Sequence, residues 1–333
     1  MRGALASLGM IMVALLTGCT PEAGPVEPGP TRSETPASGP PSTAPTPRPS
    51  PSTASPTPTP TPPPAEVSAG RILADIERLA GDIGPREATS KAFYAAAELV
   101  ETRFDDLGYR TSRTEVEVPA GNSWGTRVRA GTSANVIADS PGLDPERDHV
   151  VIGAHLDTVP VAPGAEDNAS GIAVMLELAR LAATERPEVP VRFIAFGAEE
   201  PRGDGDALHH FGSQQFVADL SGAERRAVRA MVSLDRVGVR ADYVPVCRGG
   251  SYGRDLQDQL RAAARAVRIT TRSCENRSSD HWSYEKVEIP AARLGSIAYA
   301  GYHSRDDVPS VVNRGQLDRV GRLMWSWLGR LRS

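Results

Sequence analysis

The sequence predicts an α/β fold: a three-layer sandwich in which helices cover both faces of a mostly parallel central β-sheet. The first observation is a set of short, continuous apolar runs, which suit strands buried on both faces. These runs are Val150–Ala154, Val191–Phe196, Ala230–Leu234 and Ala291–Tyr299. The second is that segments with helical periodicity separate them. The third is that each run leads to polar side chains, at the edge where open α/β sheets place their ligands.

The N-terminus is typical of a lipoprotein signal peptide over residues 1–18. Met1-Arg2-Gly3 precedes an apolar run to Leu16, which at about 14 residues is shorter than a membrane-spanning helix needs. The run ends in Leu16-Thr17-Gly18-Cys19, which resembles the bacterial lipobox, where the cysteine is acylated. The alternative is an ordinary signal peptide with a chance cysteine. We expect an extracytoplasmic protein, attached to membrane lipid through acylated Cys19 or secreted.

Residues 19–66 are expected to be the lipidated cysteine and a disordered linker rich in Pro, Ser and Thr. Positions 20–66 hold 17 of the 29 prolines, and Val26 is their only aliphatic residue larger than alanine. Such a segment cannot offset the entropy of ordering its backbone, which favours a stalk. Residues 67–333 are predicted to form one domain with a large core. The net charge of −4 offers no basic surface, so nucleic acid is excluded as a partner.

Helical periodicity begins the folded part. Two helices are predicted over Ile72–Leu79 and Phe93–Leu107, with Gly81 and Gly108 expected to end them. Thr114–Val118 then alternates like a half-exposed strand. Further helices are predicted over Gly171–Ala183, Ala207–Leu220, Asp255–Val267 and Gly315–Leu331.

Two histidines and three carboxylates stand at or after the ends of the apolar runs: His155, Asp167, Glu200, Asp235 and His303. Imidazole and carboxylate ligands suit zinc, and five are too many for one open catalytic zinc. Two Zn²⁺ ions about 3.5 to 4 Å apart, sharing one bridging carboxylate, would use them all. The remaining histidines, His149, His209, His210 and His281, are interpreted as packed or surface residues.

These motifs resemble one known family over about residues 70–330. The segments are His155-Leu156-Asp157-Thr158, Glu166–Gly171, Phe196–Glu200, Ser233–Asp235 and Tyr302-His303. Together they are similar to the secreted two-zinc aminopeptidases of the bacterial leucyl aminopeptidase type. The resemblance implies a zinc-dependent exopeptidase fold and a zinc peptidase catalytic domain at residues 67–333.

The resemblance also assigns metal roles. It implies that Asp167 bridges the two zinc ions, that His155 and Asp235 complete one site, and that Glu200 and His303 complete the other. Asn168-Ala169-Ser170 matches a glycosylation pattern, but beside Asp167 it is better interpreted as the start of a helix.

Three further residues receive catalytic roles from the resemblance. Glu199 would be the general base, and Tyr302 would donate a hydrogen bond to the tetrahedral oxyanion. Asp157 would hold the other imidazole nitrogen of His155 and fix its tautomer. Asp307, or the neighbouring Asp306, would do the same near His303.

The sequence departs from the family pattern at Arg236, where the family usually has a bulky apolar residue, often methionine. In one interpretation this arginine points away or pairs with a surface acid. In the other it lines the pocket and favours acidic or carboxylate-bearing substrates.

Cys247 and Cys274 remain once Cys19 is acylated, and an even pair in an exported domain favours a disulfide over two buried thiols.

The sequence thus predicts a monomeric zinc aminopeptidase that removes N-terminal residues from peptides. Glutaminyl cyclisation on the same scaffold with one zinc is an alternative. A zinc-binding lipoprotein without turnover is another, and it gives Glu199 no task. The metal ligands alone do not separate an aminopeptidase from a carboxypeptidase, because that choice depends on which terminal charge the pocket walls recognise.

Overall fold

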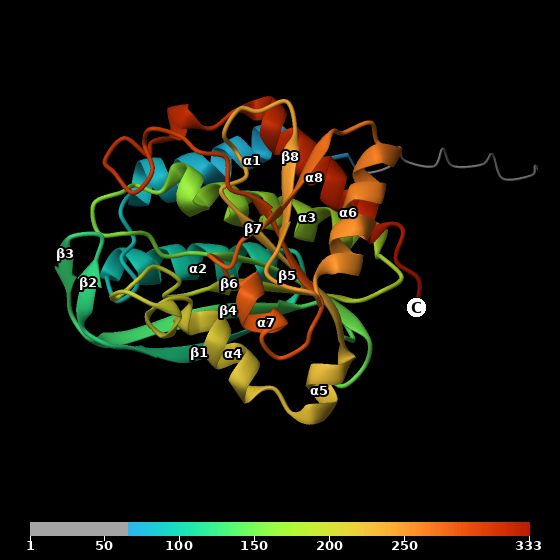
Figure 1. The fold of residues 1–333 in the computed structure, drawn as a ribbon, viewed down its shortest axis with the longest axis horizontal. Coiled ribbons are helices and arrows are strands. Elements are labelled where there is room, and N and C mark those ends of the chain that lie inside the picture. Colours follow the sequence, from blue (N-terminus) through green and yellow to red (C-terminus); the bar gives the residue numbers. More distant parts are fainter. Residues whose placement is uncertain (1–65) are drawn as a thin grey trace, which may run out of the picture. The chain divides into compact units, whose positions relative to one another are not determined.

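The computed structural model describes residues 66–333 and confirms the predicted α/β fold (Figure 1). Its centre is an eight-stranded mixed sheet. In spatial order the strands are β1 (Arg110–Val118), β4 (Gly131–Asp139), β6 (Val191–Phe196), β5 (His149–His155), β7 (Val228–Asp235), β10 (Ala291–Gly295), β8 (Val244–Arg248) and β9 (Thr271–Glu275). The four neighbours β6, β5, β7 and β10 are mutually parallel, so their carboxyl ends lie at one edge.

Helices cover both faces of this sheet. One face carries α1 (Ala69–Ile76), α2 (Lys91–Asp106), α3 (Ser170–Glu185), α6 (Arg254–Ala266) and α8 (Arg314–Leu328). The opposite face carries α4 (Phe211–Asp219) and α7 (His281–Glu285), while α5 (Gly222–Ala227) leads into β7. Side-chain oxygens cap several of these helices. Ser90, for example, accepts a hydrogen bond from the backbone N–H of Phe93 at the start of α2, as N-cap serines do.

Alternating side chains of the central strands build two cores. In β5, Val150 and Ile152 face the larger core between the sheet and α1, α2, α3, α6 and α8, whereas Val151 faces the smaller core beneath α4 and α7. Because both faces are covered, the apolar runs are continuous, as a sheet buried on both sides requires.

The predicted signal peptide, Cys19 and residues 19–65 of the predicted linker lie outside the described residues, and the domain boundaries stay predictions. Within 66–333, no helix combines the length and the apolar character that crossing a bilayer requires.

Two predicted helix ends differ from the structure. The first helix does not stop at Gly81 but continues as a wider π-helical segment, Glu77–Ile83, until Gly84, whose φ of 79° breaks the helix. The helix predicted over Ala207–Leu220 is divided, because His210 has a left-handed backbone with φ 55°. A short 3₁₀ turn, Asp206–Leu208, precedes that point and α4 follows it. Gly108, with φ 81°, does follow the end of α2 as predicted.

The strand predicted over Ala291–Tyr299 is also shorter, since β10 ends at Gly295, where φ is 115°. A side chain there would meet the carbonyl oxygen of Asp235 at 2.1 Å, so the chain turns away on a residue without one. The strands β8 and β9 were not predicted.

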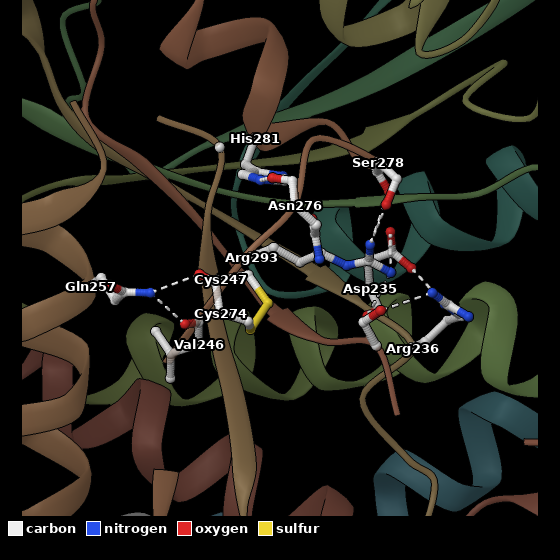
Figure 2. Close-up of a disulfide and its surroundings, with 12 residues drawn as sticks. Asp235, Arg236, Val246, Cys247, Gln257, Cys274, Asn276, Ser278, His281 and Arg293 are labelled. Atoms are coloured by element: carbon white, nitrogen blue, oxygen red, sulfur yellow. Dashed lines mark hydrogen bonds and ion pairs between the residues drawn. A yellow bond between two sulfur atoms is a disulfide. The ribbon is translucent and has the colours of Figure 1, made fainter. Parts of the chain in front are cut away.

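The predicted disulfide is present and joins these two strands. Cys247 of β8 and Cys274 of β9 are register partners in a parallel pair, and their sulfur atoms are bonded (Figure 2).

A two-stranded hairpin, β2 (Gly121–Ser123) and β3 (Thr126–Val128), stands apart from the main sheet. The backbone N–H of Asn122 donates to the carbonyl of Arg202 at 3.0 Å, and Gly121 approaches that carbonyl more closely than any side chain would allow. This contact places Trp124, in the hairpin turn, at the functional edge of the sheet.

Candidate metal centre

All five predicted metal ligands meet at the carboxyl edge of the four parallel strands. His155 ends β5 and Asp235 ends β7, so their positions are set by the strands themselves. Asp167 lies before α3, Glu200 follows β6, and His303 lies in the loop after β10. The side chains of all five are buried, the most exposed being His303 at 7%.

Asp167 lies between the two histidines. Its Oδ1 is 3.1 Å from Nε2 of His155, and its Oδ2 is 3.1 Å from Nε2 of His303. Asp235 Oδ1 lies 3.8 Å from His155 Nε2, and Glu200 Oε2 lies 3.5 Å from His303 Nε2. These contacts place one histidine and one further carboxylate on each side of Asp167.

The donor set fits metal ions. Ligand atoms of His155, Asp167 and Glu200 all lie within 4.8 Å of one another, and the same is true of His155, Glu199 and Asp235. Asp235 Oδ1 is buried and has no hydrogen-bond donor among residues 66–333. Burying a carboxylate oxygen that accepts no hydrogen bond destabilises the folded state unless a cation lies beside it. This oxygen is therefore suited to a metal ion.

The carboxyl groups of the cluster differ in their electrostatics. Burial opposes the ionisation of Asp167, but hydrogen bonds with His155 and His303 outweigh it and hold the pKa of Asp167 below its usual value. Burial, together with the charges of Asp167 and Glu199, raises the pKa of Glu200 well above its usual value. The centre thus concentrates negative charge that a cation would neutralise.

Asp157 does not hold His155 in the predicted way. Its carboxylate is 3.8 Å from His155 Nδ1, and the backbone carbonyl of Asp157 lies closer, at 3.1 Å. The carboxylate instead accepts hydrogen bonds from the backbone N–H groups of Glu199 and Glu200, at 2.9 and 3.1 Å. Asp157 therefore fixes the turn that carries both glutamates.

The prediction that Asp307 holds the second imidazole nitrogen of His303 was also wrong, because its carboxylate binds backbone N–H groups instead. Its two carboxylate oxygens accept from the backbone N–H groups of Glu166 and Asp167, at 2.8 and 3.1 Å. The Nδ1 atom of His303 is buried without a partner in the described part of the chain. Asp307 thus holds the backbone at Asp167, while Asp306 is exposed.

Asn168 explains why the chain turns at this point. Its Nδ2 donates to the carbonyl of Leu234 in β7, and its Oδ1 accepts from the backbone N–H of Gly171 in the first turn of α3. The helix start predicted here is confirmed, since α3 begins at Ser170. Asn168 thereby links the backbone next to Asp167 to strand β7 and to helix α3 through hydrogen bonds.

The sequence did not indicate two residues that contact the cluster, His210 and Arg293. His210 is buried, as interpreted, but its Nε2 lies 3.3 Å from Glu199 Oε1. Burial opposes the ionisation of Glu199, and His155 and His210 outweigh it, so the pKa of Glu199 is lowered. The second is Arg293 of β10, whose Nη2 lies 3.0 Å from Asp235 Oδ2. The same guanidinium donates to the carbonyl of Ser278.

A cavity of about 120 Å³ opens beside the cluster. Besides candidate ligands and Glu199, its wall includes Trp124, Arg236 and Tyr302. The ring of Tyr302 stacks on that of His303 with centroids 3.6 Å apart, and Trp124 meets His303 edge-on at 4.3 Å. Burial and the charge of Asp167 raise the pKa of Tyr302, so its hydroxyl keeps its proton.

The fold and this cluster define an α/β protein with a buried group of histidines and carboxylates, suited to metal ions, at the carboxyl edge of its parallel strands. The chain belongs to peptidase family M28, whose model matches residues 135–328.

Two relatives in sequence show how far the similarity extends. The chain is 32% identical over 206 residues to aminopeptidase YwaD of Bacillus subtilis, a match that covers 58% of this chain and 43% of that protein. It is 30% identical over 277 residues to the uncharacterized protein YfbL of Escherichia coli, covering 68% of this chain and 76% of that protein. The chain therefore spans less than half of the Bacillus enzyme.

Solved structures share the fold. A zinc aminopeptidase from Bacillus subtilis superposes with a TM-score of 0.69 at 20% identity, covering 78% of this chain and 94% of that one. A glutaminyl cyclase from Porphyromonas gingivalis gives a TM-score of 0.69 at 22% identity, covering 79% and 99%.

Proposed function

We propose that this protein is a zinc-dependent aminopeptidase that hydrolyses N-terminal residues from peptides. One observation carries the proposal: the two oxygens of Asp167 each lie 3.1 Å from a histidine that has its own carboxylate partner. Membership of a peptidase family, and relatives named as aminopeptidases, support the same activity.

In this proposal His155 and Asp235 would hold one zinc ion, Glu200 and His303 would hold a second, and Asp167 would serve both. Bound zinc supplies a Lewis acid for the scissile carbonyl and lowers the pKa of water toward about 7. A pair of ions suits the shared position of Asp167 better than a single ion would.

Glu199 is the proposed general base. Its carboxylate accepts a proton from the attacking water and returns it to the leaving amine. The backbone N–H bond to Asp157 and the contact with His210 hold Glu199 in place. Tyr302, in the cavity wall, is the proposed donor to the carbonyl oxygen as negative charge develops there.

The test uses aminoacyl-anilides. We expect the purified protein to release the anilide group, to lose activity with a chelator, and to regain it with zinc. Glu199→Gln is expected to lower kcat by about 10²- to 10⁴-fold while zinc, measured by elemental analysis, stays bound. Full activity of this variant, or a wild-type protein that hydrolyses no substrate after zinc loading, would contradict the proposal.

Glutaminyl cyclisation is the second candidate, because glutaminyl cyclases are among the proteins that share the fold. A cyclase would release ammonia from an N-terminal glutamine peptide without cleaving it, and would do so with one zinc per chain. Product analysis by mass spectrometry and the zinc stoichiometry separate the two activities. A protein that only binds zinc would do neither.

We also propose that the chain is exported and held at the membrane by acylated Cys19. The disulfide between Cys247 and Cys274 supports export, because such bonds persist in oxidising compartments. The full chain is expected to partition into the detergent phase and to incorporate labelled fatty acid, and Cys19→Ala to do neither. Equal partitioning of both would reject the anchor.

A further inference from the structure

We infer that the cavity beside the metal centre selects substrates that carry a carboxylate, and that Arg236 receives this carboxylate. The inference rests on the proposed peptidase function and names its substrate class. The carboxylate has two sources in a peptide: the side chain of an N-terminal glutamate or aspartate, and the C-terminus of a dipeptide.

The backbone of Arg236 is fixed from two sides. Its N–H donates to Asn168 Oδ1 at 3.3 Å, and its carbonyl accepts from the N–H of Ser296 at 3.0 Å. The residue has a left-handed backbone with φ 57° directly after the last residue of β7. These contacts hold it at the carboxyl edge of the sheet, beside the metal ligand Asp235.

The side chain is held along the cavity wall. Its Cζ lies 4.2 Å from the centre of the Tyr302 ring, and Nη2 donates to Ser296 Oγ at 2.9 Å. It therefore does not point away from the site or pair with a surface acid. A guanidinium fixed in this way loses little entropy when it binds a ligand, which favours a strong contact.

Arg236 keeps most of its hydrogen-bonding capacity. A guanidinium has five N–H donors, and in the described residues the side chain of Arg236 makes one hydrogen bond, to neutral Ser296. Its Nε lies 4.0 Å from Asp235 Oδ1, which makes a long ion pair but is beyond hydrogen-bond distance, so this contact uses none of the donors. Figure 2 shows that Asp235 lies between two arginines, and Arg293 already binds its Oδ2 at 3.0 Å.

The surroundings of Arg236 match a carboxylate-bearing peptide. The cavity is about 120 Å³, and an engineered cavity of about 150 Å³ binds benzene, so a short side chain or a chain terminus fits. The same wall includes Trp124, with 57% of its surface exposed, which offers an apolar surface to the rest of the substrate. A planar guanidinium binds a carboxylate through two parallel hydrogen bonds and repels lysine and arginine side chains.

Three peptides distinguish the two sources. Gln-Leu-amide carries no carboxylate, Glu-Leu-amide carries one on its side chain, and Gln-Leu carries one at its C-terminus. Hydrolysis is followed by release of leucine or leucinamide, which cyclisation would not produce. Binding is measured separately by calorimetry on the zinc-loaded Glu199→Gln protein, so the inference does not depend on turnover.

The variants isolate the charge of Arg236. Arg236→Met removes the guanidinium and introduces the residue common in the family, and Arg236→Lys keeps the charge without the planar fork. Arg272→Met is the matched control, because Arg272 also lies over a tyrosine ring, that of Tyr243 at 3.9 Å, but on β9 and outside the cavity. Thermal unfolding confirms that each variant folds.

We expect one carboxylate peptide to bind about tenfold or more tightly than Gln-Leu-amide, and the same peptide to have the higher kcat/KM. Arg236→Met should abolish the difference, Arg236→Lys should reduce it, and Arg272→Met should preserve it. Equal binding of all three peptides, or a difference that survives Arg236→Met, would overturn the inference. Selective binding without hydrolysis by the wild type would reject the proposed function and leave the inference standing.

Discussion

Arg293 is a charged residue in the buried strand β10, where it pairs with Asp235. The guanidinium meets Oδ2 of this carboxylate, and Oδ1 has no hydrogen-bond partner in the described residues, so Oδ1 could bind a metal ion. We predict that Arg293→Met lowers the free energy of unfolding by roughly 3–5 kcal/mol, because it leaves a buried carboxylate without its partner. Urea unfolding measures this loss.

The same substitution should also lower zinc occupancy, since Asp235 would lose its orientation. Arg272→Met, which changes an exposed arginine, serves as the control and should differ little from the wild type. Unchanged stability and unchanged zinc content in Arg293→Met would show that the ion pair does not hold the ligand.

The predictability of the site varies from residue to residue. The convergence of the five candidate ligands could be predicted because each lies at or after the end of an apolar run and belongs to a motif. The contacts of Asp157 and Asp307 could not be predicted. Each carboxylate could accept a hydrogen bond from an imidazole or from a backbone N–H, and the sequence does not indicate which donor it meets. Arg293 did leave a signal, since an arginine within an apolar strand requires a buried acid. His210 left none.

At the scale of elements, the structure shows why some segments were predicted well and others were missed. The run Val191–Phe196 was predicted with its observed bounds because strands buried on both faces are continuously apolar. Strand β9 (Thr271–Glu275) is mostly polar and lies at the edge of the sheet, so no apolar pattern marks it. The π-helical extension past Gly81 depends on tertiary packing, which the helix propensity of individual residues does not predict.

The disulfide yields a prediction for this edge of the sheet. It closes a loop with a sequence separation of 27 residues, which carries α6 between β8 and β9. Replacing both Cys247 and Cys274 by serine should lower the free energy of unfolding by about 3 kcal/mol, mainly because the unfolded chain gains freedom. Urea unfolding of the variant should match that of the reduced wild type. Coinciding curves for the variant and the oxidised wild type would contradict the prediction.

At the scale of the whole molecule, the five candidate ligands come from the ends of β5 and β7 and from the segments after β5, β6 and β10, so metal binding would be a property of the complete domain. The apo protein gathers several carboxylates in a buried space, so ions that bind only the folded state should stabilise it. We predict a stabilisation of about 2.7 kcal/mol per site when free zinc is 100 times the dissociation constant. Thermal unfolding with zinc, compared with chelator, measures it.

Two variants sharpen this test. Glu199→Gln should retain the zinc-dependent shift in Tm, because Glu199 is the proposed base rather than a ligand. Asp167→Asn should lose most of the shift, because both proposed sites share Asp167. A Tm that is the same with zinc and with chelator in the wild type would contradict the metal centre.

The place of β10 in the sheet has a consequence for biosynthesis. This strand lies beside β7, yet β8, α6, β9 and α7 separate the two along the chain, and His303 follows only after β10. In a growing polypeptide, four of the candidate ligands therefore precede the fifth, His303, by more than the whole of β8 to β10. A chain that ends before β10 would therefore lack His303 and could not assemble the complete cluster.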